Sequence, residues 1–512
     1  MGLAAFIALF FLVPDGATSW VLIANLATFY ALFLRAITNP DRLLPRLPSY
    51  LTVEVLFFAY SYLIFYYPYQ LFVLGATDLR VSRFVSNSFV DGSNKAITLT
   101  TIGMLAFTIG HRILGRAGRL GADDADLTEP DRDDGGRRSL FRPLAIASSA
   151  LLLMLVAIYL LAGWRSAGEG RYTGTTTNAL GIEGTSTAVL VLCMMVAALW
   201  VYARANALDT PPILVIGLMV TVGWAVRLLL LGDRNSFLLV ALVLVGGYFT
   251  FVRRASLIVL AGSFGVWMIL YYAIEVLRTI PNWYRTGNFM QALEYSQYQQ
   301  GASGENSFNV TTITLRATVE VVPDGHDFMY GVLKVIQASS AIPFSGKLYL
   351  PYLKPEYSNS AEMLTEILLG RRATWGTGTN VISDSYLDFG VLGVVAIMFA
   401  LGLSARAIRN YVARDPYDPH RVVMYLLALA LFAELPRYAI EVPIRFLAWA
   451  LILSTVIKAT AGRLHKRRRP GSSGARPKTS TTTEEFVSRN EQGQRRTPFV
   501  VKSAAHEDPG NE

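Results

Sequence analysis

Long apolar blocks recur along most of the chain, and they restrict its fold more than any other feature. Many are roughly 17 to 25 residues long, which is the length a helix needs to cross a hydrocarbon layer about 30 Å thick. In lipid the backbone must satisfy its own hydrogen bonds, and separate apolar blocks do so as helices. With 53% hydrophobic and 16% charged residues, the sequence predicts an all-α, polytopic membrane helix bundle.

About twelve spans can be assigned to these blocks. The first block, MGLAAFIALFFLV, is short enough for the core of a signal peptide, but it lacks a basic n-region and a small-residue cleavage site, so it is kept as a span. The expected spans are 2–13, 18–36, 50–74, 96–114, 143–163, 185–203, 212–231, 236–252, 256–276, 382–404, 422–435 and 444–460.

Positive charge is distributed unevenly between the loops. With the N-terminus in the cytoplasm, the cytoplasmic loops contain about twice as many Lys and Arg residues as the short outer loops. Cationic loops tend to stay in the cytoplasm, so both termini are predicted to lie there. The cytoplasmic loops are then 35–46, 112–142, 204–211, 253–255 and 405–421.

Two polar segments depart from this pattern of short loops. The stretch from about 278 to 380 is placed outside, and a loop of that length is usually functional. The tail 462–512 contains RLHKRRRP and too little apolar surface to fold. We expect a transmembrane domain at 1–461 and a disordered cytoplasmic tail whose basic residues contact anionic lipids, although positive-inside anchoring explains the same residues.

Charge and cysteine usage narrow the possible partners. The net charge of +9 is concentrated in the tail and in alternate loops, which indicates lipid headgroups rather than nucleic acid. The single cysteine, Cys193, lies inside an apolar block, so an intrachain disulfide is excluded. HExxH and CxxC motifs are absent, and we expect neither a metal nor a cofactor.

The long outer loop is rich in aromatic side chains. Aromatic rings stack on the apolar faces of sugars, and they sit equally well at a membrane interface. Composition does not separate these two uses. The candidates for sugar binding are Trp283, Tyr284, Tyr330 and Trp375.

Two arginines interrupt the apolar stretch GWAVRLLLLGDRN. Arg227 and Arg234 are seven residues apart, so they share a face if one helix continues through both. Two stacked guanidinium groups near the outer surface suit a doubly charged ligand such as a diphosphate. Alternatively, Arg227 pairs with a buried carboxylate and Arg234 extends to the interface.

The stretch ELPRYAIEVPIRF contains a second group of charges between the last two spans, formed by Glu434, Arg437, Glu441 and Arg445. Alternating signs at this spacing are typical of a self-neutralising network. In a functional interpretation Arg437 and Arg445 contact phosphate, and one glutamate is a base. His326, in the sequence DGHD, is a further acid or base candidate, although a lone histidine in a polar loop is more often ordinary surface.

Three stretches carry a resemblance to a known family. The two spans split by GDRN, the passage ATVEVVPDGHDFMYGVLKVIQASSAIPFSG and the passage GTGTNVISDSYLDFGVLGVVAIMFALG resemble segments of O-antigen polymerases (Wzy) and the related O-antigen ligases. The resemblance covers roughly 212 to 460. Asp233 and Asn235 depart from it, because small residues usually flank the arginine.

The resemblance implies a membrane glycosyltransferase that polymerises oligosaccharide repeat units carried on undecaprenyl diphosphate. Arginines would stabilise the departing diphosphate, which requires no metal. The general base would be Asp384, Glu434, Glu441 or His326, and spacing does not choose among them. A chain-length regulator and a flippase are further expected partners.

Three rival functions remain open. An O-antigen-type ligase would use the same donor with another acceptor. A transporter of lipid-linked sugars would carry intramembrane arginines too, but it would be expected to show internal repeats, and none is evident. A lipid-phosphate-sugar glycosyltransferase usually has an acidic pair in its first outer loop, where this chain has only Asp15.

Overall fold

The computed structural model describes most of the chain. The described residues are 2–38, 41–44, 47–82, 85–119, 134–163, 185–230, 233–253, 255–278, 307–343, 345, 352, 359–370, 373 and 376–468. Part of the predicted outer loop and the tail from residue 469 onward therefore lie outside the description. Helix α20 covers the first residues of the predicted tail, as far as Arg468. The predicted disorder of the remaining tail lies outside the described residues.

Helices make up nearly all of the regular structure, as the apolar blocks predict. In the first half these are α1 (Gly2–Leu12), α2 (Ser19–Thr38), α3 (Val53–Ser61), the π-helix η1 (Tyr62–Tyr66), α4 (Tyr67–Val73), the 3₁₀ turn η2 (Val90–Gly92), α5 (Ser93–Arg119), α6 (Asp134–Gly163), α8 (Thr185–Ala205) and α9 (Pro212–Leu230). A short antiparallel pair of strands, β1 (Asp41–Leu44) and β2 (Leu47–Ser49), joins α2 to α3.

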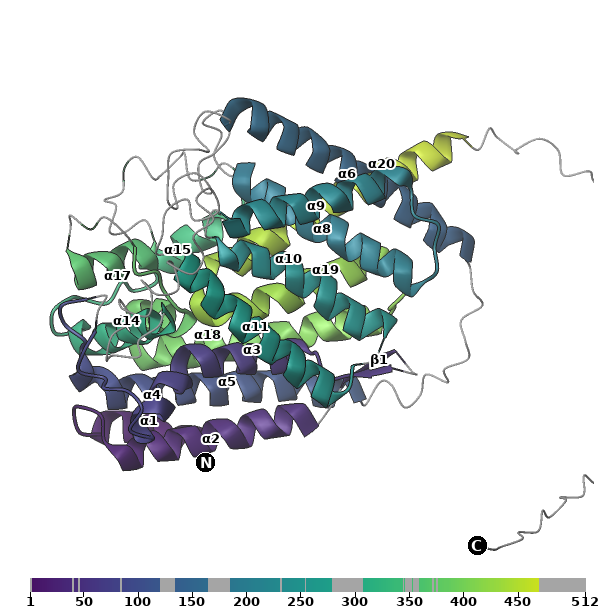
Figure 1. Cartoon of the computed structure of the whole chain (residues 1–512). Helices are drawn as coiled ribbons and strands as arrows, with labels where there is room; N and C mark the ends of the chain where they lie inside the picture. The colour runs from purple at the N-terminus through teal and green to yellow at the C-terminus, as the bar shows by residue number, and fades with distance from the viewer. Residues whose placement is uncertain are drawn as a thin grey trace, which may run out of the picture. The chain divides into compact units, whose positions relative to one another are not determined.

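The second half continues the bundle (Figure 1). Its elements are α10 (Arg234–Gly247), the π-helix η4 (Tyr248–Val252), α11 (Leu257–Arg278), α14 (Ser307–Val321), α15 (Val332–Ser339), α17 (Ser360–Leu369), α18 (Val381–Ala413), α19 (Pro419–Glu434), the 3₁₀ turn η8 (Leu435–Arg437) and α20 (Glu441–Arg468).

Nine helices in the described part of the chain are long and apolar enough to cross a membrane. They coincide with nine of the predicted spans, which establishes a multi-pass membrane protein. The other three predicted spans correspond to the short helix α1, to the succession α3–η1–α4 and to α11. The count of twelve therefore stays a prediction.

The closest helix packing in the bundle joins α5 and α18. A Cβ atom on Gly110 would collide with the carbonyl oxygen of Phe399, and one on Gly402 would collide with that of Phe107. Small residues at such crossings let two backbones approach, which is how helices gain contact in lipid. Two glycines, one from each helix, thus fix α18 against the N-terminal half of the chain.

Contacts between connections occur at both ends of the bundle. At one end, Gly16 N donates to Asp91 O at 2.8 Å and Thr18 N donates to Asn94 Oδ1 at 3.0 Å. At the other, Tyr202 donates through its hydroxyl to Tyr417 O. Two connections predicted to lie outside, 14–17 and 75–95, are therefore in contact with each other. The end of α8 contacts the connection 405–421, which is predicted to be cytoplasmic.

Candidate active site

The first turn of α18 is fixed by its own capping residue. Asn380 accepts from Ser383 N at 2.8 Å through Oδ1, and its Nδ2 donates to Ser383 Oγ at 2.8 Å. The same amide donates to Thr314 Oγ1 on α14 at 3.3 Å. Such a cap satisfies backbone donors that the helix leaves open. Two carboxylates, Asp384 and Asp388, follow one turn apart, and both are completely buried.

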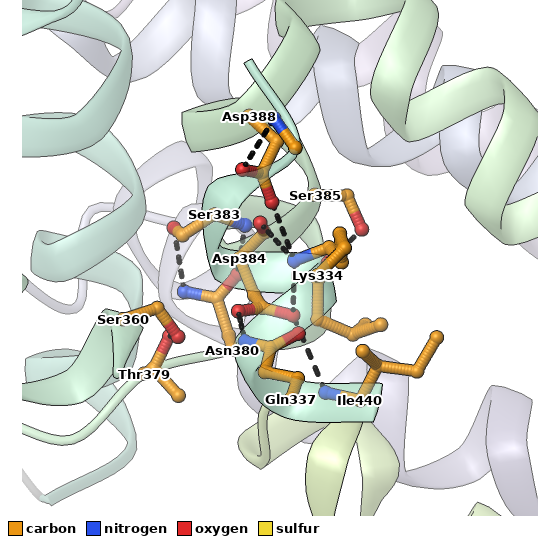
Figure 2. A network of polar contacts seen from close by, with 12 residues as sticks. Lys334, Gln337, Ser360, Thr379, Asn380, Ser383, Asp384, Ser385, Asp388 and Ile440 are labelled. Atoms are coloured by element: carbon orange, nitrogen blue, oxygen red, sulfur yellow. Dashed lines mark hydrogen bonds and ion pairs between the residues drawn. The ribbon is translucent and has the colours of Figure 1, made fainter. Parts of the chain in front are cut away.

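Lys334, from the helix α15 of the long loop, lies between these carboxylates (Figure 2). Its Nζ is 2.9 Å from Asp384 Oδ2 and 3.0 Å from Asp388 Oδ2. Gln337, one turn along α15, donates from Nε2 to Asp384 Oδ1 at 2.6 Å. A buried charge is tolerated only when it is paired and hydrogen-bonded, so the three charged groups form one ion cluster.

A break in α18 gives this loop its docking position. Phe389 and Gly390 have non-helical torsions, and Gly390 has φ +60°, which favours glycine. The break leaves carbonyls without helical partners, and the loop supplies donors for them: Met329 N donates to Leu387 O at 2.9 Å and Tyr330 N to Asp388 O at 3.0 Å. Backbone and ion cluster together therefore attach the loop to α18.

The segment between α19 and α20 reaches the same cluster. Ile440 N donates to Asp384 Oδ2 at 3.3 Å. The next residue, Glu441, lies within electrostatic range of Asp384 and Lys334 and pairs with Arg445 at 3.3 Å. Both side chains of this last pair are partly exposed, at 21% and 28%. Glu441 is thus a partly exposed carboxylate beside the ion cluster, whose own two carboxylates are buried.

The GDRN turn lies against the other end of this segment. Helix α9 ends at Leu230 and α10 begins at Arg234, so no continuous helix stacks Arg227 under Arg234. Asp233 caps α10, because its Oδ1 accepts from Ser236 N at 3.1 Å. Asn235 Oδ1 accepts from Arg437 Nη1 at 3.3 Å. The turn and the second charged stretch therefore form one surface.

Arg234 is buried, with 2% of its surface exposed. Glu434, at the end of α19, is buried too, and the charges of Arg437 and Arg234 act on it. The interpretation in which Arg234 extends to the interface is therefore wrong. Burial next to Glu434 raises the pKa of Tyr438 well above its ordinary value, because an ionised phenol there would be both desolvated and repelled.

The side chains of the remaining sequence candidates lie apart from these contacts or outside the description. Arg227 packs on the rings of Trp224 and Tyr159, with its guanidinium carbon 4.7 and 5.5 Å from their centroids. His326 has its Nδ1 2.7 Å from Asp327 O, and Tyr330 is 72% exposed. Trp283, Tyr284 and Trp375 lie outside the described residues.

The sequence analysis did not single out two members of the ion cluster, Lys334 and Asp388, or the neighbouring Gln337. A lysine in a polar loop ordinarily indicates solvent-exposed surface, and its partners lie about fifty positions away in the chain. The available signal was the spacing of each pair, three residues from Lys334 to Gln337 and four from Asp384 to Asp388, which places each pair on one helical face.

The described residues contain no group of three or more His, Cys, Asp or Glu side chains arranged to hold a metal ion. Among the described cations at this end of the bundle, Lys334 pairs with two buried carboxylates and Arg234 is itself buried, whereas Arg445 is partly exposed. The arrangement supplies positive charge and an accessible carboxylate within one segment.

Comparison with known proteins found no match among curated proteins and none among solved structures. The family model described as O-antigen polysaccharide polymerase Wzy matches residues 6–461. This range includes the whole charged end described above and all predicted spans apart from the first residues of the first one, and it extends well beyond the part of the chain that carried the resemblance. A match over so much of the chain shows the family: the chain belongs to the O-antigen polysaccharide polymerase Wzy family, whose members are membrane proteins of polysaccharide biosynthesis.

Proposed function

We propose that this protein joins oligosaccharide repeat units carried on undecaprenyl diphosphate, at the outer face of the cytoplasmic membrane, with both termini inside and about twelve spans. The observation that supports this best is the convergence of the GDRN turn, the start of α18 and the segment 434–445 at one end of the bundle. Charged groups near the ends of membrane spans are usually functional, and cations there would suit the diphosphate of a lipid carrier.

The accessible pair Glu441 and Arg445 is the natural reaction centre. Asp384 has both carboxylate oxygens occupied by donors and is buried, and Glu434 is buried within reach of the charges of Arg437 and Arg234. Neither can approach a sugar hydroxyl as it stands. Glu441 can, since its side chain is partly exposed and accepts a hydrogen bond from Arg445 at 3.3 Å. We therefore assign the base to Glu441 among the candidates, and to Asp384 the positioning of the segment.

The chemistry follows from this assignment. An acceptor hydroxyl attacks the anomeric carbon of the growing chain while the bond from that carbon to the diphosphate oxygen breaks. The bonding electrons leave with undecaprenyl diphosphate, and the hydroxyl proton passes to the Glu441 carboxylate. Arg445 and Arg437 stabilise the charge on the departing diphosphate. An incoming diphosphate would draw Arg445 away from Glu441, which frees the carboxylate to act.

The self-neutralising network remains the competing interpretation of these charges, and a Glu441→Gln variant distinguishes the two. As the base, Glu441 contributes about 10²- to 10⁴-fold to the rate, so purified Glu441→Gln protein should lose the growth of glycan ladders from lipid-linked repeats by that factor. As a structural partner only, its neutral isostere should retain most of the activity and lower the thermal stability instead.

Arg421→Ala is the matched control. Arg421 and Asp418 form a similar partly exposed pair at the opposite end of the bundle, so its loss should leave ladder growth unchanged. The same assay separates the rival functions. A ligase would add glycan once to a different acceptor, and a transporter would form no ladder in detergent, so complete absence of ladders from the unmodified protein would reject the polymerase.

A further inference from the structure

Helix α15 has two faces of different character. Leu333 and Gln337 are completely buried, and Lys334 reaches the α18 carboxylates from the same side. On the opposite side Val332 and Val335 are 48% and 73% exposed. The buried side explains how α15 is held. Nothing in the candidate reaction site explains an exposed aliphatic face.

The serine side chains of α15 and of the turn after it bond to the backbone of their own segment. Three serine hydroxyls donate to backbone carbonyls of the same segment, each at 2.6 Å: Ser339 to Ile336, Ser340 to Gln337 and Ser345 to Ser339. Hydroxyls bonded to nearby carbonyls in this way need no water partner, so they are compatible with an apolar surrounding.

The exposed face of α15 continues a surface that already faces lipid. Helix α18 is a membrane span, and its outward residues Phe389 and Leu392 are 49% and 76% exposed. The Phe389 ring lies against Gly331, the residue before α15, so closely that a Cβ there would be 2.8 Å from the ring. The apolar surface therefore passes from α18 onto α15 without a gap.

We propose that α15 lies in the membrane interface with Val332, Val335 and the exposed Ile342 in bilayer hydrocarbon. Its eight residues span about 12 Å, too short to cross a membrane and suited to lie along its surface. Tyr330, whose ring is exposed, lies at the same edge and has the amphipathic character of an interfacial residue. The long outer loop thus returns to the bilayer beside the ion cluster.

This placement goes beyond the proposed function and does not depend on it. It can be tested by nitroxide labelling of Val335→Cys and Ile342→Cys in the full chain, in vesicles of phosphatidylethanolamine and phosphatidylglycerol. The native Cys193 is completely buried in α8, so it does not compete for the label. Molecular oxygen concentrates in hydrocarbon and a neutral nickel chelate in water, and both are measured by power saturation of the nitroxide signal.

Two exposed positions provide the reference values. Met219→Cys, on the outward side of the spanning helix α9, reports lipid, and Ala76→Cys, in the connection before α5, reports water. At Val335 and Ile342 we expect relaxation by oxygen to exceed relaxation by the nickel chelate, as at Met219. Preferential relaxation by the chelate, as at Ala76, would overturn the proposal, and so would protection from both reagents, which would mean that protein covers the face. Ladder growth is not measured, so failure here leaves the proposed function untouched.

Discussion

Lys334 carries an ammonium group that pairs with both buried carboxylates, Asp384 and Asp388. Loss of this positive charge should therefore affect the stability of the protein. Its Nζ is within 3.0 Å of both Asp384 and Asp388. Without it, two carboxylates would stay buried with no cation between them. Breaking a buried pair by removing one partner typically costs about 3–5 kcal/mol, whereas replacing all partners by neutral groups costs much less.

Lys334→Met should therefore lower the free energy of unfolding by about 3–5 kcal/mol, measured from denaturant unfolding in detergent. The triple variant Lys334→Met, Asp384→Asn, Asp388→Asn should recover most of this loss, because no charge is left buried. Lys95→Met, which removes an exposed pair with Asp15, is the matched control and should change little. If the triple variant is no more stable than Lys334→Met, the cluster is not held by charge pairing.

At the scale of single elements, close packing of α5 and α18 decides where the start of α18 can lie. Gly110 and Gly402 permit it, since a Cβ at either would overlap a backbone carbonyl of the opposite helix. A backbone atom cannot turn aside as a flexible side chain can, so one helix would have to move away from the other. Asp384 and Asp388 are carried on α18, and they would move with it.

Gly402→Ala should accordingly destabilise the protein by about 1–3 kcal/mol, as overpacking does, and it should reduce polymer formation in proportion to the folded fraction. Gly223, within α9, has no atom within 4 Å of the place where a Cβ would stand. Gly223→Ala should be neutral or stabilising by about 0.5–1 kcal/mol, since alanine favours the helix. Equal melting temperatures for the two variants would show that α5 and α18 can separate at little cost.

Sequence reasoning was most successful where a signal is local. Apolar length predicted the spanning helices, and charge in apolar sequence drew attention to the segment from Glu434 to Glu441, which the structure places against Asp384. It did not single out Lys334, because a lysine's environment depends on which helix lies opposite. One of the two interpretations of Arg234 had its side chain extend to the membrane interface. Arg234 is buried instead, and the burial of an arginine depends on the fold around it.

At the scale of the whole molecule, the arrangement of the connections follows from alternation alone. Successive spans cross in opposite directions, so the connections before and after each span belong to opposite ends, and the contacts from Gly16 to Asp91 and from Tyr202 to Tyr417 agree with this. Alternation does not say which end faces the cytoplasm. That assignment rests on the excess of Lys and Arg in one set of loops, and the candidate active site must be outside for an outer-face polymerase.

Cysteine labelling tests this orientation, because Cys193 is buried and the chain has no other cysteine. Ala76→Cys and Ala413→Cys place a thiol at exposed positions in connections predicted to lie on opposite sides. In right-side-out vesicles a membrane-impermeant maleimide should label the residue at 76 and spare the one at 413, and in inverted vesicles the preference should reverse. Detergent should expose both, which controls for reactivity. Labelling of position 413 alone in right-side-out vesicles would place the charged end of the bundle in the cytoplasm, and it would remove the outer-face reaction proposed for Glu441 and Arg445.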